Sequence, residues 1–329
     1  MDSGAPATDR RILATTPGFP VEARVRNSAP GPRVFLLMNT FHALVWIAAA
    51  MVALAALEAV LPLRALGASR RAHLGPNLVL TAITFAANAL LNLALVAALA
   101  WAQSAQLGAI PALALPAPWG AALAVIGFDL AWYATHVSMH HSATLWRFHR
   151  VHHSDCAVDV TTAIRQHPGE TLIRYAYYAA FGIALGAAPA AFALYRVWSA
   201  LHGLFEHANL RLPLALDSAL SWVVASPNMH KVHHSRAPQW TNSNYGNILA
   251  LFDRAFGTFT PARRGVDIDY GLDGCDDPAL QTTAGLLALP FRSLLVADDQ
   301  LNRSSSSSRV IADPSAAPSA ASASARLRA

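Results

Sequence analysis

Twelve of the 14 histidines lie between residues 136 and 234, and eight of these fall in three short patterns. The patterns are HxxxH at 136–140, HxxHH at 149–153 and HxxHH again at 230–234. Residues three and four apart share a face of a helix, so each pattern brings its imidazoles together. Neutral imidazole is a good ligand for iron, zinc and copper. Because one tetrahedral ion takes four ligands, eight histidines indicate two metal ions.

Other metal chemistries lack the residues they need. Cys156 and Cys275 are the only cysteines, which excludes a four-cysteine zinc site and an iron–sulfur cluster. The ExxH pairs of soluble di-iron bundles and the HExxH motif of zinc proteases are both absent. A single HxxHH pattern could simply be the solvated face of a helix. Three histidine patterns beside apolar runs are poorly explained in that way. A zinc-binding membrane structural or transport protein is the alternative from another class.

The elements that position these histidines are apolar. The composition is 54% apolar and only 13% charged, against about 25% charged in soluble domains. A helix needs about 20 apolar residues to cross a bilayer. Three runs fit, at 35–61, 78–101 and 119–135, and a fourth at 175–201 contains Pro189. The sequence therefore predicts an all-α integral membrane protein with three crossing runs.

The fourth run is expected to be a two-helix membrane hairpin. Pro189 and the small residues before it interrupt the run near its middle, where proline breaks the helical hydrogen-bond ladder. The histidines before and after this run can share a site only if it crosses the membrane an even number of times. We therefore expect a hairpin, and a helical cap that holds two metals.

The distribution of arginines predicts the orientation. Arg64, Arg70 and Arg71 lie between the first two runs, whereas residues 102–118 carry no charge. The positive-inside rule then places 62–77 and the histidines on the cytoplasmic face of an inner or plasma membrane. Arginines before residue 34 conflict with this, so the side of the N-terminus stays open. The net charge of +5 fits this loop bias, and no basic, aromatic-rich recognition helix indicates nucleic acid.

The segment around the histidines resembles the membrane-bound fatty acid hydroxylase and sterol desaturase superfamily, whose non-haem di-iron enzymes carry the same three boxes. The resemblance covers roughly 119–262 and includes LWRFHRVHHS at 145–154, HPGE at 167–170, EHAN at 206–209, PNMH at 227–230, NYG at 244–246 and FDRAFGT at 252–258. Val137 stands where the family usually has arginine, which puts any role of that arginine in doubt but leaves the ligands intact.

The resemblance implies a ligand for each box histidine, with His207 as a ninth and His202 as a weaker tenth. The box histidines are His136, His140, His149, His152, His153, His230, His233 and His234. Metal-bound imidazole usually needs a partner for its free N–H. The partners expected are Asn209, Asp253 and Asn244, with Asp155 and Glu170 as alternatives that would otherwise cap helices. His141 and His167 are expected beside the ligands, and His42 and His73 as polar residues at the membrane interface.

Five segments follow from these predictions. They are a disordered polar arm (1–33), N-terminal membrane helices (34–118), the catalytic domain (119–262), an amphipathic surface segment (263–299, with its apolar stretch at 280–295) and a disordered Ser/Ala-rich tail (300–329).

The resemblance also implies the chemistry. Two irons would activate O2 to hydroxylate, or to desaturate, a lipid such as a fatty acyl chain, a sterol or another isoprenoid, and hydroxylation is our prediction. Each turnover needs two electrons. The chain has no dinucleotide-binding glycine motif after a strand and no haem-attachment motif. We therefore expect a separate donor, such as a ferredoxin or a cytochrome with its reductase.

Overall fold

A computed structural model describes residues 32–293. Nearly all of the predicted arm, the whole predicted tail and the end of the 263–299 segment lie outside these residues. Within them the secondary structure is helical, with isolated β-bridges but no strand. The predicted all-α class is confirmed.

Three helices are long and apolar enough to cross a membrane. α1 (Pro32–Val60), α2 (Gly67–Ser104) and α4 (Ala117–His141) contain the three predicted runs. Large apolar side chains such as Trp46, Leu90 and Leu93 are exposed on α1 and α2. Apolar surface of this extent is unusual on a soluble protein and fits contact with lipid. The prediction of an integral membrane protein with three crossing helices is confirmed.

The fourth apolar run forms two helices, α6 (Pro168–Leu185) and α7 (Pro189–His207). α6 ends at Gly186, whose φ of 67° is in the left-handed region that favours glycine. Pro189 occupies the first turn of α7, where its missing N–H costs nothing. The helix break therefore lies where it was predicted, and the position of this pair in a membrane stays a prediction.

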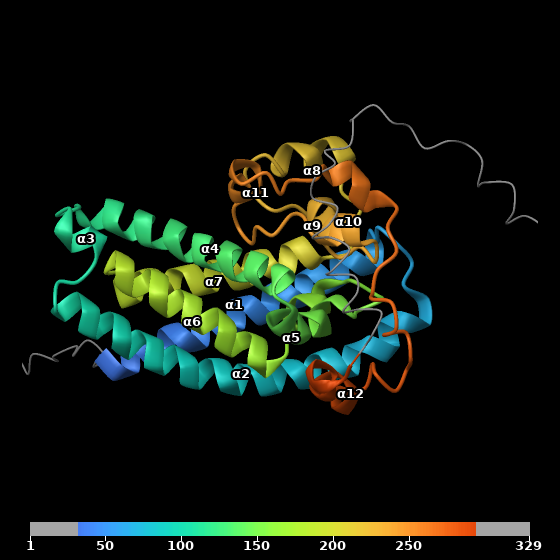
Figure 1. The fold of residues 1–329 in the computed structure, drawn as a ribbon, viewed down its shortest axis with the longest axis horizontal. Coiled ribbons are helices and arrows are strands. Elements are labelled where there is room, and N and C mark those ends of the chain that lie inside the picture. Colours follow the sequence, from blue (N-terminus) through green and yellow to red (C-terminus); the bar gives the residue numbers. More distant parts are fainter. Residues whose placement is uncertain (1–31, 294–329) are drawn as a thin grey trace, which may run out of the picture. The chain divides into compact units, whose positions relative to one another are not determined.

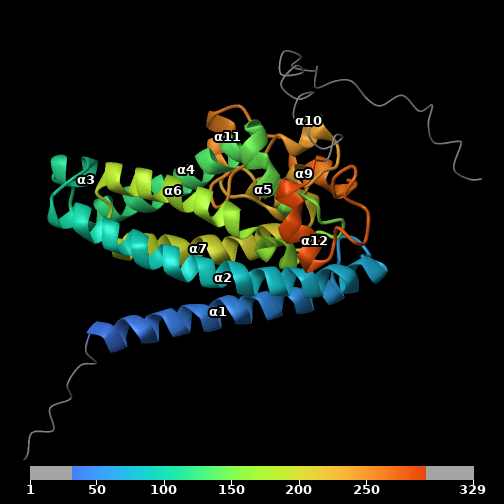
Figure 2. The same ribbon diagram turned by 60° about the horizontal axis from the view of Figure 1, so that its bottom comes forward.

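The helices α2, α4, α6 and α7 pack side by side (Figures 1 and 2). Their shared core is aromatic. The Phe128 ring of α4 lies 6.1 Å from Tyr178 of α6, 5.0 Å from Phe192 and 5.8 Å from Tyr195 of α7, between ring centroids. This packing fixes the register of the helices. As a result, α4 and α7 each bring histidines to the same end of the helix bundle, where α4 supplies one histidine group and α7 the other.

Short helices complete the described chain. They are α3 (Ala109–Ala112), α5 (Ala143–His153), α8 (Leu214–Leu220), α9 (Pro227–His233), α10 (Pro238–Thr241), α11 (Leu251–Ala255), α12 (Thr283–Ala288) and the 3-10 turns η1 (Val160–Ile164), η2 (Ala262–Val266) and η3 (Leu289–Phe291). Except for α3, which joins α2 to α4, they gather where α4 and α7 end (Figure 1).

The amphipathic stretch predicted at 280–295 is described up to residue 293. It forms α12 and η3, and Leu286 and Leu289 pack in a buried cluster with Trp146 of α5 and Leu80 of α2. Its leucines therefore cover the histidine-bearing helix α5. Contact between this segment and a membrane surface stays a prediction.

Candidate metal centre

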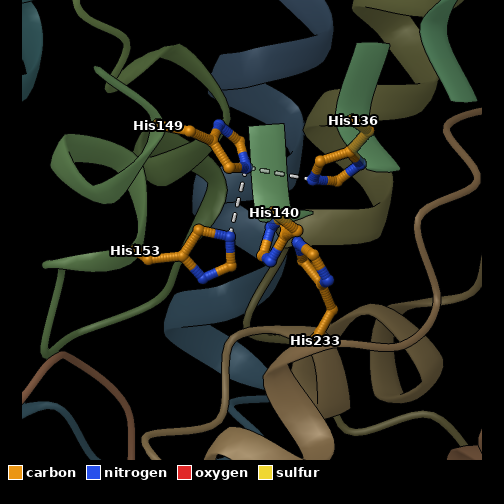
Figure 3. A group of neighbouring side chains, drawn as sticks. All are labelled: His136, His140, His149, His153 and His233. Carbon is orange, nitrogen blue, oxygen red and sulfur yellow. Dashed lines mark hydrogen bonds between the residues drawn. The ribbon is translucent and has the colours of Figure 1, made fainter. Parts of the chain in front are cut away.

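Nine buried histidines form two groups, and in each group one nitrogen per residue lies within 4.8 Å of the others. The five-histidine group contains His136, His140, His149, His153 and His233 (Figure 3). The four-histidine group contains His152, His207, His230 and His234. Every box histidine and the predicted ninth histidine belong to one of the two groups.

Each HxxHH pattern contributes to both groups. His149 and His153 enter the five-histidine group, whereas His152 enters the other; His233 likewise separates from His230 and His234. At about 100° per residue, positions i+3 and i+4 lie on opposite sides of position i. The i, i+4 pair therefore enters one group and the i+3 imidazole enters the other.

Acceptors lie beside three Nδ1 atoms of the five-histidine group. His136 Nδ1 lies 2.8 Å from the Tyr245 carbonyl oxygen, and His233 Nδ1 lies 2.8 Å from the Ser243 carbonyl oxygen. His149 Nδ1 lies 3.3 Å from a carboxylate oxygen of Glu170. Carbonyl and carboxylate oxygens only accept hydrogen bonds, so these Nδ1 atoms carry the proton. The Nε2 atoms then hold free lone pairs.

The four-histidine group repeats this arrangement. His207 Nδ1 donates to the Gly203 carbonyl at 2.7 Å, and His152 Nδ1 donates to the Arg165 carbonyl at 3.3 Å. Glu206 lies behind His230, with Oε2 3.8 Å from Nδ1. Here too the lone pairs of Nε2 point into the group.

These Nε2 atoms approach one another closely. The Nε2–Nε2 distances are 3.0 Å for His136–His149, 3.2 Å for His149–His153, 3.1 Å for His152–His207, 3.0 Å for His207–His230 and 3.2 Å for His230–His234. Nε2 of His140 and of His233 is buried without a protein partner. Lone pairs that face each other at this distance repel, and a cation between them removes the repulsion. The residues present therefore fit a metal ion in each group.

Burial favours the neutral form of His152, His153 and His234. It lowers the pKa of His152 to about 3, with the neighbouring His149 as the next cause. Burial, reinforced by adjacent imidazoles, also lowers the pKa of His153 and His234 well below the usual value. Burial alone would raise the pKa of Glu170, but His149 and Arg174 together lower this pKa to about 2. Neutral imidazoles backed by an ionised carboxylate are in the state that metal binding requires.

Three further predicted histidines lie outside both groups. His202 Nε2 donates its N–H to the Ala225 carbonyl oxygen at 2.8 Å, so this nitrogen has no lone pair for a metal. His141 is exposed, and its Nε2 lies 3.4 Å from the Tyr245 hydroxyl. His167 precedes α6 and accepts the Gly169 N–H at 2.9 Å, which makes it a helix cap.

The three predicted imidazole partners bind backbone groups rather than the grouped imidazoles. The Asn209 side chain binds the backbone of Arg64, and the Asn244 amide binds two carbonyl groups. Asp253 accepts the Tyr245 N–H at 2.8 Å, and the Tyr245 carbonyl in turn holds His136. None of the three has a hydrogen bond to a grouped imidazole among those described.

His73 differs from the expectation of an exposed interface residue. It is buried in α2, with Nδ1 3.0 Å from Asp155 and Nε2 3.3 Å from Asp159. Asp155 therefore partners His73, and Asp159 also caps η1. Since Asp155 lies two residues after His153, this contact ties α2 to the histidine helix α5.

Sequence reasoning gave no role to Glu206 or to the backbone acceptors of the groups. The position of Glu206 directly before His207 was a usable signal. The carbonyl groups of residues 165, 203, 243 and 245 had no sequence signal, because every residue carries a carbonyl group and only the tertiary structure determines its direction.

The fold and the site define a helical integral membrane protein with two buried histidine groups suited to metal ions. The comparisons with known proteins are more specific. Residues 121–258 match the fatty acid hydroxylase family, so this part of the chain is similar to that family.

Curated relatives match between 45% and 48% of the chain. The chain is 32% identical over 155 residues to alkylglycerol monooxygenase of Xenopus tropicalis, across 47% of this chain and 33% of the relative. It is 34% identical over 151 residues to alkylglycerol monooxygenase of Danio rerio, across 45% and 33%. It is 30% identical over 159 residues to ornithine lipid hydroxylase OlsE of Rhizobium tropici, across 48% and 47%. The match thus spans a third to a half of these relatives. No solved structure matches.

Proposed function

We propose that this chain is an O2-dependent hydroxylase of a membrane lipid, with two irons held by its two histidine groups. The observation that carries the proposal is the approach of paired Nε2 lone pairs to about 3 Å in a buried, neutral site. An arrangement with no cation would leave this repulsion uncompensated. Bound iron would supply O2 activation and the insertion of one oxygen atom into a C–H bond.

The nine grouped histidines are the proposed ligands, five for one ion and four for the other. His202 is left out because its Nε2 faces a carbonyl group. Iron is favoured over zinc by the family and by relatives whose names describe hydroxylation and monooxygenation. The chain's own residues hold the imidazoles neutral, fix their protonated nitrogen and exclude water from the site.

A lipid substrate fits both the relatives and the geometry. Alkylglycerols and ornithine lipids are the substrates printed in the relatives' names, and both are lipids. His136 and His140 lie in the last two turns of α4, the helix that forms the third candidate span. A lipid in the bilayer can therefore reach them without crossing bulk water. Because the matched relatives are hydroxylases, we propose hydroxylation rather than desaturation.

The reaction balances as one C–H bond, O2, two protons and two electrons giving C–OH and water. The two electrons come from outside the chain, and we propose a ferredoxin or a cytochrome with its reductase. Arginines between the first two spans support a cytoplasmic position for the histidine end, where such donors occur.

The test is a lipid profile of cells with and without the protein. We expect one lipid class to gain a species that is heavier by one oxygen atom. His230→Ala should abolish this species, and His202→Ala, outside both groups, should keep it. A purified protein that holds zinc and yields no oxidised lipid with any donor would instead favour the zinc-binding structural or transport alternative.

A further inference from the structure

Six large apolar side chains lie exposed on α8, on α11 and on the chain next to these helices. They are Leu214, Leu216, Trp222, Val223, Leu251 and Phe256, between 42% and 63% exposed. We call this surface the α8–α11 patch. The backbones of Val223 and Ala250 pair at 3.0 Å, and an Arg254 N–H donates to the Ser221 carbonyl at 3.1 Å. These contacts join the two helices into one surface beside the C-terminal half of α4 (Figure 1).

The depth of α11 follows from its contact with α4. The Phe256 ring stacks on Tyr133 of α4, with 5.4 Å between centroids. Trp119, 69% exposed, lies at the start of the same span, where indole rings favour the interface. Fourteen residues at 1.5 Å each put Tyr133 about 21 Å from Trp119 along the helix. A hydrocarbon core is about 30 Å thick, so Phe256 lies about 9 Å inside its far boundary, within the depth of about 5–10 Å that interfacial segments reach.

The depth of α8 follows independently from α1. The Leu63 N–H donates to the Asn209 carbonyl at 3.0 Å, and the Arg211 N–H donates to the Leu61 carbonyl at 2.9 Å. The span in α1 ends at Val60, and Val60 and Leu61 are both exposed. Residues 209–211 are therefore held where α1 leaves the membrane. α8 begins three residues later, at the same boundary.

The flanking charges suit a lipid interface. The Arg254 guanidinium lies 3.8 Å from the centroid of the Trp222 ring and 3.7 Å from that of Phe259. Arg211 is exposed just before α8. Aromatic rings with adjacent arginines are typical of segments that lie at lipid headgroups, where the cation meets phosphate. α8 and α11 lie near the same membrane boundary, as contact with a bilayer requires. Contact with a protein partner would not require the two helices to share a depth.

We propose that the α8–α11 patch lies in the lipid interface on the histidine side of the membrane, as a non-spanning contact with the bilayer. The patch adjoins the five-histidine group through aromatic rings. Phe256 contacts Tyr133, Tyr133 lies 6.2 Å from Tyr245, and Tyr245 lies 5.1 Å from His140, between centroids. This contact depends on neither the metal nor the reaction.

Spin labels on the full chain in phosphatidylcholine and phosphatidylglycerol vesicles test this proposal. Cys156→Ser removes the exposed native cysteine, and Leu216→Cys or Phe256→Cys then carries the label. Leu90→Cys, exposed on the span of α2, provides the lipid reference, and Gln239→Cys, exposed on α10, provides the water reference. Collisions with O2 report lipid, and collisions with a charged nickel chelate report water.

Labels at 216 and 256 are expected to behave like the label at 90, with O2 collisions several-fold more frequent than nickel collisions. Nickel collisions at both sites as frequent as at 239 would overturn the proposal. Protection from both reagents would overturn it too, since a second copy or another protein would then cover the patch. An unfolding temperature in detergent equal to that of the unlabelled protein shows that each variant is folded.

Discussion

The imidazoles of His152 and His153 are adjacent in the chain, yet their rings are perpendicular, with 5.4 Å between centroids, and enter different groups. His233 and His234 repeat this relationship, with rings at 90° and 5.6 Å between centroids. α5 and the end of α9 thus each serve both groups. A movement of either helix displaces ligands of both proposed ions.

The two groups should respond differently to the loss of one ligand. His234→Ala leaves three histidines in its group, whereas His233→Ala leaves four in the other. Four ligands satisfy a tetrahedral ion and three do not. We expect His234→Ala to lose close to one iron per chain and His233→Ala to retain both irons with weaker affinity. Metal analysis after anaerobic purification measures this, and equal loss in both variants would count against the five-and-four division.

The carboxylate of Glu170 should support metal binding through His149. Glu170→Gln removes the charge 3.3 Å from His149 Nδ1, and changes of this kind lower metal affinity about 10–100-fold. Glu206→Gln is the matched comparison. Its oxygens stand farther from imidazole nitrogens, at 3.7 and 3.8 Å, so we expect a smaller effect. Competition with a chelator measures both affinities, and the reverse order would contradict this role for Glu170.

The buried contact between His73 and Asp155 should stabilise the fold. Removing one partner of a buried pair costs about 3–5 kcal/mol, because the other is left without compensation. We expect His73→Ala to lower the unfolding temperature in detergent markedly. The double variant with Asp155→Ala should lose clearly less than the sum of the two single variants. Additive losses would show that the two side chains do not act as a pair.

The turn that follows α2 should tolerate no side chain at Gly108. A Cβ there would lie 2.1 Å from the Gly186 nitrogen, and the φ of 98° is itself unfavourable for alanine. Gly274→Ala is the matched control, since its φ is 81° but nothing lies within 4 Å. The left-handed conformation alone costs about 1–2 kcal/mol. Thermal unfolding should show a larger loss for Gly108→Ala, and equal losses would rule out crowding between the two turns.

The spans and the helix break were predictable because their signals are local. Run length alone identifies a helix that crosses a bilayer, and Pro189 marks the break by its own chemistry. The ligand-bearing segments were equally visible, since the spacing of HxxHH is a property of one helix. The division of each HxxHH pattern between two histidine groups could also have been predicted, because the angle between positions i+3 and i+4 follows from helical geometry.

Partners distant in sequence were beyond prediction. His73 lies 82 residues from Asp155, and only the packing of α2 against η1 brings them together. The acceptor for His136 is the Tyr245 carbonyl group, 109 residues further along the chain. The acceptor for His233 is the Ser243 carbonyl group, ten residues further along. A backbone carbonyl has no sequence signature, so its direction comes from tertiary structure alone.

The iron content of protein purified without oxygen tests the central claim most directly. Two histidine groups with converging Nε2 atoms predict about two irons per chain. His202→Ala should keep that value, because His202 faces the Ala225 carbonyl group outside both groups. A stoichiometry near zero, or two tightly held zinc ions in its place, would contradict the di-iron account.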